Sequence, residues 1–295
     1  MGTSFCHQLI KAGHTPIPVV KESSVPVDFD RRNKQITAVP ELVKVILDCD
    51  AVVHLAAITQ ANSNMTDIEI SWFREINVKF TESLAKASII AKVPRFIFVS
   101  SIKVNGEKTC GKPFRADDPP NPEGIYSITK YEAEKVLHDL SQDSYFRPII
   151  IRPPLIYGGN AKGIVANLLG IVSKGVPLPL AGIQNKRSLV SLPLMCDLLE
   201  ICLTHPNAPG HTFLVSDGVA RSTPDIIRMV SSLYGLSPRL FYCPEWILRS
   251  AAKVLGKPNL VPKLTSDLEI DIESTIEILH WNPTSRMRYL GKRIS

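Results

Sequence analysis

A serine, a tyrosine and a lysine in the first half of the chain have the types and spacing needed for proton transfer. Ser101 ends an apolar run, Tyr126 follows it after a loop, and Lys130 lies one helical turn beyond Tyr126 on the same helix face. A nearby ammonium stabilises a phenolate and lowers a tyrosine pKa from about 10 towards neutrality, while a serine hydroxyl can hold the reacting oxygen. The three residues predict an acid/base site that exchanges a proton with a hydroxyl group while a hydride moves to or from the same carbon.

The Tyr-x-x-x-Lys spacing occurs a second time, at Tyr131 and Lys135. Five residues along a helix correspond to about 140° of rotation, so the two tyrosines cannot both face one site. Tyr126 is the better candidate because it lies at the start of the helix, beside a loop rich in Gly and Pro. From spacing alone, a surface Tyr-Lys pair remains the alternative.

The segments around these residues predict a parallel sheet. Apolar runs typical of strands occupy residues 16–20, 51–57, 95–101 and 148–152. Helical spacing occupies residues 3–12, 41–48, 66–91 and 126–140. Strands that alternate with helices imply βαβ units and a sheet covered by helices on both faces. The predicted fold class is therefore α/β, with a doubly wound (Rossmann) parallel sheet.

After Arg152 the alternation weakens, and prolines punctuate short helices and turns. This change predicts a sheet domain over residues 1–155 and a smaller C-terminal lobe over residues 156–295, with some segments of the lobe returning to the sheet. Ligands of open α/β sheets bind beyond the carboxyl ends of the strands. We therefore expect the binding cleft between the sheet and the lobe.

Composition excludes several classes of protein. The formal charge is +6, but Lys and Arg are dispersed among acids, so no nucleic-acid partner is expected. The six cysteines show no Cys-x-x-Cys spacing, which argues against a metal site or a disulfide framework and for reduced thiols in the cytoplasm. No apolar run approaches the roughly 18 residues of a membrane span. Residues 245–256 are amphipathic, and we interpret them as core packing, with membrane contact as the less favoured alternative.

Four segments carry a resemblance to a known family. In chain order they are FIFVSSIKVNGE, EGIYSITKYEAEKVL, RPPLIYG and LPLAGIQNKRSLV. Their order, spacing and strand context resemble the extended short-chain dehydrogenase/reductase family (NAD-dependent epimerase/dehydratase), specifically its nucleotide-sugar epimerases and reductases. The resemblance implies that Ser101, Tyr126 and Lys130 are catalytic, with Thr129 in place of the serine common before the lysine. It also implies NAD or NADP as cofactor, and a homodimer formed through helices 66–91 and 126–140.

The resemblance extends to residues that would bind cofactor and substrate. The implied cofactor-binding residues are Gly2, His54, Ala56, Ala57, Ser100, Tyr126, Lys130 and Pro153. The implied substrate-binding residues are Asn77, Ser101, Asn167, Leu168 and Arg187, of which Arg187 suits the diphosphate because a guanidinium binds phosphate oxygens in pairs. Plainer interpretations are open for three of them: His54 as a packed strand residue, Arg187 as a solvated cation and Asn167 as a solvent-facing helix residue.

The chain departs from this family at its start. Members begin with a strand and the pattern Gly-x-x-Gly-x-x-Gly, whereas this chain begins near the last glycine, Gly2, so the first strand is expected to be missing. That strand would lie between the strands predicted at residues 16–20 and 51–57. Its loss would leave backbone N–H and C=O groups of these two strands without hydrogen-bond partners. Gln35 replaces an aspartate that reaches the adenine, and Lys21 stands where an acid would bind the ribose, which favours NADP over NAD. The chain is either a truncated form of a working enzyme or a relative that has lost its cofactor, and its intact catalytic residues favour the first.

The favoured function is a 4-epimerase or 4-keto reductase of a UDP-hexose or UDP-N-acetylhexosamine. A sugar dehydratase is less favoured, because Ile102 and Lys103 follow Ser101 where those relatives carry an Asp-Glu pair. The non-catalytic alternative is a cofactor-deficient protein that binds sugar nucleotides or has a regulatory role.

Overall fold

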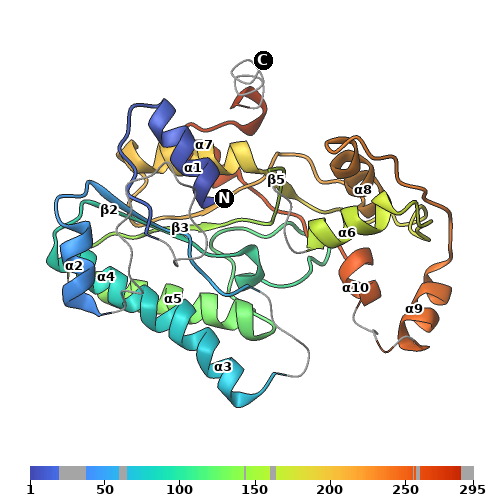
Figure 1. Cartoon of the computed structure of the whole chain (residues 1–295), viewed down its shortest axis with the longest axis horizontal. Helices are drawn as coiled ribbons and strands as arrows, with labels where there is room; N and C mark the ends of the chain where they lie inside the picture. Colours follow the sequence, from blue (N-terminus) through green and yellow to red (C-terminus); the bar gives the residue numbers. More distant parts are fainter. Residues whose placement is uncertain are drawn as a thin grey trace.

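Helices and strands alternate along the chain in this computed structural model, which describes residues 1–19, 38–59, 65–142, 144–159, 164–254, 256 and 260–286 (Figure 1). The elements of the first half are α1 (Gly2–Lys11), α2 (Val39–Ile46), β1 (Ala51–His54), α3 (Asp67–Arg74), η1 (Glu75–Lys79), α4 (Phe80–Ile90), β2 (Arg95–Val99), η2 (Ile102–Val104) and α5 (Ile125–Gln142). Those of the second half are β3 (Ile149–Arg152), β4 (Leu155–Tyr157), α6 (Ile164–Ser173), β5 (Leu189–Ser191), α7 (Leu192–Thr204), β6 (Thr212–Leu214), α8 (Thr223–Ser232), α9 (Glu245–Val254), α10 (Leu260–Thr265) and α11 (Glu273–Leu279).

The main sheet contains four parallel strands in the order β1-β2-β3-β6. Its central strands β2 and β3 are almost continuously apolar and buried, as expected for strands covered on both faces. Figure 1 shows α1 and α7 on one face of the sheet and α2, α4 and α5 on the other. The doubly wound α/β fold predicted from the sequence is therefore confirmed.

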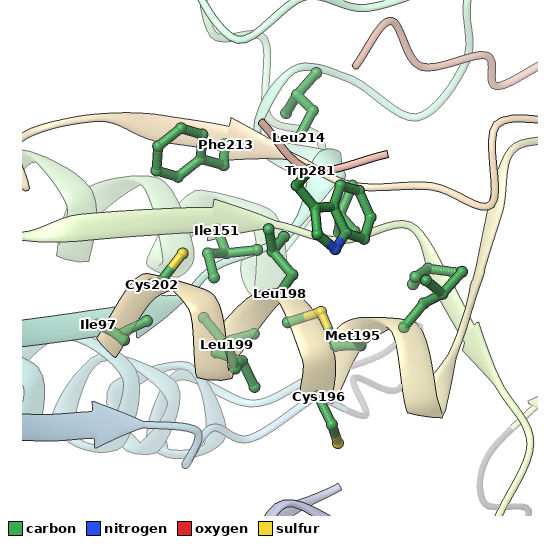
Figure 2. Close-up of a cluster of buried hydrophobic side chains, with 14 of the residues drawn as sticks. Ile97, Ile151, Met195, Cys196, Leu198, Leu199, Cys202, Phe213, Leu214 and Trp281 are labelled. Atoms are coloured by element: carbon green, nitrogen blue, oxygen red, sulfur yellow. The ribbon is translucent and has the colours of Figure 1, made fainter. Parts of the chain in front are cut away.

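The face of the sheet under α7 carries the larger part of the core. Figure 2 shows side chains of α7, among them Leu198 and Leu199, beside side chains of the strands and the ring of Trp281. Trp281 is fully buried, and its indole nitrogen donates a 2.8 Å hydrogen bond to Asp197 on α7. A buried carboxylate is tolerated here because this donor and Arg286, 3.3 Å away, satisfy it.

The strand predicted over residues 16–20 is wrong over the part that the structure describes. Residues 16–19 form no strand, and Val20 lies outside the described residues, as do Lys21 and Gln35. Pro16 and Pro18 supply no backbone N–H, so this segment can donate few ladder hydrogen bonds. Among the described strands, β1 pairs with β2 alone and forms the edge of the sheet.

The helical prediction for residues 66–91 is confirmed, with one irregularity. The segment begins at a capping box between Thr66 and Glu69, then passes from α3 through η1, one turn of π-helix, into α4. A π-turn inside an α-helix often marks a functional position, because its extra residue redirects the side chains around it. Here η1 contains Asn77, one of the predicted site residues.

The C-terminal half contributes both to the sheet and to a separate lobe. Helix α7 and strand β6 pack with the sheet, whereas β4 and β5 form a small parallel pair beside α6 and α8. The domain boundary at residue 155 stays a prediction. Within the described part of the chain, none of the helices combines the length and the apolar character needed to cross a membrane.

Candidate active site

Ser101 and Tyr126 meet at the carboxyl edge of the sheet. Ser101 follows β2 and caps η2, where its hydroxyl accepts a hydrogen bond from the Lys103 amide at 3.3 Å. Tyr126 lies in the first turn of α5, just after Gly124, whose φ of +80° favours glycine. The Ser101 side chain lies close enough to Tyr126 to lower the pKa of its phenol. The structure therefore brings together two residues separated by a long loop, as the sequence predicted.

Lys130 lies one turn further along α5 and is almost completely buried, with 1% of its surface exposed. Its Nζ lies 3.8 Å from the centroid of the Phe98 ring, in the geometry of a cation–π contact. Burial lowers the pKa of Lys130 to about 7, and the negative charge of Glu134 acts in the opposite direction. Burial favours the neutral amine of Lys130, whereas the carboxylate of Glu134 favours the charged ammonium.

The pKa of Tyr126 differs from the expectation that Lys130 would bring it towards neutrality. Burial raises the pKa of Tyr126, and the nearby Ser101 side chain only partly offsets that rise. Lys130 does not contribute to this shift, and its Nζ lies over the Phe98 ring. The expected lowering of the Tyr126 pKa by Lys130 is therefore not found in the protein alone.

A buried ion pair lies one turn beyond Lys130. Arg152, the last residue of β3, donates from Nε and Nη2 to the two carboxylate oxygens of Glu134 at 3.0 and 2.6 Å. The side chains are only 7% and 5% exposed. Arg152 also donates to Asn105 Oδ1 at 3.0 Å, which connects the loop after η2 to the same network. This network fixes α5, β3 and that loop relative to one another, and the sequence analysis missed Glu134, whose signal was a charge four residues after Lys130.

Asn77 holds the segment after β1 against α5. It is fully buried, accepts from the Ile58 amide at 2.8 Å, and donates to the Ile58 carbonyl and to Thr129 Oγ1 at 3.0 Å each. These contacts position the residues that follow the strand. Asn77 is therefore placed as a positioning residue next to Lys130.

His54 ends β1 as a buried, neutral side chain. Burial lowers its pKa to about 3, and the charge of Lys130 adds to that effect. Its Nε2 lies 2.9 Å from Thr81 Oγ1, which donates its own proton to the Asn77 carbonyl. Nε2 must therefore carry the imidazole proton. The ring packs against Phe98 with a centroid distance of 5.5 Å, so the structure gives it a packing role.

The N-terminus of α1 lies beside the end of β1. A Cβ added to Gly2 would meet Leu55 Cδ1 at 3.9 Å, and among the described residues no side chain caps this helix end. Free N–H groups at a helix N-terminus attract anions. At the same edge of the sheet, Ser100 Oγ is buried without a hydrogen-bond partner in the described structure.

The comparison with known families decides the assignment. The model of the NAD dependent epimerase/dehydratase family matches residues 1–215. This chain belongs to that family. The UDP-glucose 4-epimerase of Vibrio cholerae is 41% identical over 239 residues, which are 80% of this chain and 73% of that protein.

Solved structures agree on the fold of this epimerase-family chain. The UDP-N-acetylglucosamine 4-epimerase of Bacillus cereus superposes with a TM-score of 0.75 at 20% identity, covering 96% of this chain and 91% of that one. A UDP-glucuronic acid 4-epimerase of Bacillus cereus, in complex with NAD, gives a TM-score of 0.74 at 18% identity, with coverage of 96% and 90%. At these identities the likeness concerns the fold.

The residues present fit the dinucleotide of the family. The sequence favoured NADP over NAD from Lys21, which lies outside the described residues, whereas the family to which the chain belongs is NAD dependent. The uncapped start of α1 at Gly2 suits a pyrophosphate, and the unpartnered Ser100 hydroxyl offers a free polar group at the same edge. Ala56 is exposed and Ala57 half-buried in the segment after β1, while Pro153 is buried and its carbonyl accepts from the Ile102 amide at 3.0 Å. Gly2, Ser100 and the Ala56–Ala57 segment are the residues that would hold the cofactor.

Three of the five predicted substrate residues of the epimerase-family chain, Asn167, Leu168 and Arg187, lie in the C-terminal lobe. Asn167 is exposed on α6, and Leu168 is half-buried against a small cluster with Leu180. Arg187 donates from Nη1 to the Lys263 and Ser266 carbonyls at 3.2 and 2.9 Å. In this structure Arg187 therefore connects two segments of the lobe, and a role in phosphate binding stays a proposal.

A cavity of about 320 Å³ opens in the same lobe. Its lining residues are Gly182, Ile183, Gln184, Tyr242, Cys243, Pro244, Glu245, Leu248 and Thr265. No predicted site residue is among them, so the cavity is separate from the catalytic group.

Proposed function

We propose that this chain is an NAD-dependent 4-epimerase of a UDP-hexose or UDP-N-acetylhexosamine. The observation that carries the proposal is the closeness of the Ser101 side chain to Tyr126, one turn of α5 before the buried Lys130. The 41% identity to a UDP-glucose 4-epimerase supports the substrate class. Epimerisation is favoured over reduction because that relative and the two solved structures above are named 4-epimerases.

The chemistry assigns one task to each residue. NAD, when bound, supplies the hydride acceptor and later the hydride donor for carbon 4 of the sugar. Tyr126 Oη accepts the proton of the 4-hydroxyl as the carbonyl forms and returns it when the hydroxyl is restored. Ser101 Oγ holds the 4-oxygen by a hydrogen bond, and the ammonium of Lys130 stabilises the Tyr126 phenolate.

A dehydratase remains the second candidate, since a human dTDP-D-glucose 4,6-dehydratase is 30% identical over 242 residues. Such an enzyme needs a further acid and base near the sugar. Here Ile102 is buried and apolar, and the Lys103 ammonium is paired with Glu107 at 2.8 Å. The residues after Ser101 therefore favour the epimerase.

Separate titrations with NAD and with UDP-sugars test the function. We expect calorimetry to show binding of NAD and of UDP-glucose or UDP-N-acetylglucosamine, and chromatography to show conversion of that sugar nucleotide to its 4-epimer. Binding of both ligands without any turnover would exclude the epimerase. Binding of the UDP-sugar without NAD would support the cofactor-deficient alternative.

We propose that the chain forms a homodimer through α3, α4 and α5. These helices pack against one another on one face of the sheet, yet α3 leaves Ile68 and Trp72, one turn apart, 71% and 59% exposed. Two large apolar side chains on one helix face are typical of an interface. The wild-type chain should therefore sediment at twice the chain mass at micromolar concentration.

Trp72→Glu should convert the dimer to a monomer, because a charge at the centre of an apolar interface is not solvated. Trp246→Glu is a matched control, since Trp246 on α9 is similarly exposed at 69% and lies far from α3. Sedimentation velocity compares the three proteins. A wild-type monomer, or a dimer unaffected by Trp72→Glu, would refute this interface.

A further inference from the structure

Helix α9 and the segment before it expose an unusual concentration of large apolar side chains. The exposed fractions are 49% for Phe241, 71% for Tyr242, 69% for Trp246, 39% for Ile247 and 88% for Val254. The interpretation of residues 245–256 as core packing is therefore wrong for most of the large side chains. We name these five residues the α9 patch.

The opposite side of the same helix already has its partners. Leu248 packs against the cluster that contains Val172 and Ile227, and Ala252 is 6% exposed. At 100° per residue, Trp246, Ile247 and Val254 lie within about 100° of one another, on the side away from Leu248 and Ala252. Helix α9 is thus anchored by one face and presents a second apolar face to its surroundings.

The segment that contains α9 carries a net positive charge. Between Arg239 and Thr265 the sequence contains five basic residues and one acid, a net charge of +4 (5 − 1) out of +6 for the whole chain. The acid, Glu245, forms an ion pair with Arg249 at 2.5 Å. The exposed bases of the described segment that remain are Arg239, Lys253 and Lys263. The sequence analysis treated the charge as dispersed, but this segment carries a local excess of bases.

The α9 patch lies at a tip of the molecule. Figure 1 shows α9 and α10 at the end of the C-terminal lobe, away from the main sheet and from α2, α4 and α5. The helix that carries most of the α9 patch is therefore distant from the sheet domain.

We propose that the α9 patch binds the surface of a membrane that contains anionic lipids. Aromatic side chains favour the level of the lipid head groups, and an amphipathic helix flanked by bases lies in the interface with its apolar face directed towards the acyl chains. Each base near the surface adds attraction to anionic lipid. The binding is peripheral and does not depend on the proposed reaction, so the two can be tested separately.

Tryptophan fluorescence tests this proposal on the full chain. The chain has three tryptophans, and Trp281 is buried, so a Trp72→Phe variant leaves Trp246 as the exposed one. Vesicles of phosphatidylglycerol and phosphatidylcholine should shift its emission to shorter wavelength and carry the protein into the pellet. Vesicles of phosphatidylcholine alone should bind less, and 0.5 M salt should release the protein, because the attraction to anionic lipid is screened.

The double variant Trp246→Ser/Lys253→Glu should weaken vesicle binding by at least about tenfold, since it removes an aromatic anchor and reverses one charge. Leu47→Ser is the control, because Leu47 is an exposed apolar residue (55%) at the end of α2 and outside the proposed dimer helices, and this variant should bind as the wild type does. Unchanged circular dichroism spectra would show that each variant folds. Failure of the wild type to bind the anionic vesicles in low salt would overturn the proposal, and so would undiminished binding of the double variant. Self-association without vesicles that depends on Trp246 would overturn it in favour of a second copy of this chain.

Discussion

Tyr126→Phe should lower turnover of the UDP-sugar by about 10²- to 10⁴-fold, the usual contribution of a positioned acid/base group. The change removes one oxygen atom and leaves the ring, which fills the same space beside Ser101. Binding of NAD and of the UDP-sugar should therefore be nearly unchanged. The measurement is kcat for the sugar nucleotide that the wild-type chain epimerises, together with the two binding constants.

The chain provides its own control for this experiment. Tyr131 and Lys135 repeat the spacing on another face of α5, with Lys135 Nζ 5.2 Å from the centroid of the Tyr131 ring. Tyr131→Phe should leave kcat within about twofold of wild type, because no step of the proposed mechanism uses it. If Tyr126→Phe turned over at the wild-type rate, or if Tyr131→Phe carried the loss instead, the proposed proton transfer would be wrong.

Glu134→Ala should lower the free energy of unfolding by about 3–5 kcal/mol. Removing one partner of a buried ion pair leaves the other charge without compensation, which costs far more than the pair itself contributes. In this variant the guanidinium of Arg152, 7% exposed, would keep only Asn105 and the Ala116 carbonyl as acceptors within its network. Urea denaturation followed by circular dichroism measures the change.

Two further variants separate charge from packing. Glu132→Ala, on the same helix, removes an exposed ion pair with Arg74 at 3.2 Å and should cost less than about 1 kcal/mol. Glu134→Met/Arg152→Met replaces the buried pair by apolar side chains and should recover much of the lost stability. If Glu134→Ala lowered the free energy of unfolding no more than Glu132→Ala does, the guanidinium of Arg152 would not be held in the buried position that the structure shows.

The sequence predicted those parts of the fold that depend on local pattern. The apolar runs around Phe98 and Ile150 identified two central strands, and the spacing of Tyr126 and Lys130, together with the family resemblance, predicted the proposed catalytic pair. Residues 16–19 were misread because an apolar run of the right length signals a strand even where prolines and the lack of a neighbouring strand prevent one.

The parts that could not be predicted depend on contacts between distant segments. Nothing local indicates that Arg152 reaches Glu134, or that the Lys130 ammonium lies over Phe98 in place of a hydrogen-bond acceptor. The sequence also could not predict which face of α9 is exposed, because helical periodicity shows that two faces exist but not which one the lobe covers. Burial and partner choice therefore had to come from the structure.

The π-turn at η1 restricts how the segment from α3 to α4 can change in length. A π-turn accommodates one residue more than the α-helix around it, which is why Asn77 reaches Ile58 while Arg74, upstream, still meets Glu132. Deleting that extra residue would restore a regular helix and leave α3 and α4 in nearly the same relative orientation, but it would turn Asn77 out of its present position. The contact of Asn77 with Ile58 would then be lost while the ion pair of Arg74 with Glu132 would be kept, so the extra residue serves the position of Asn77.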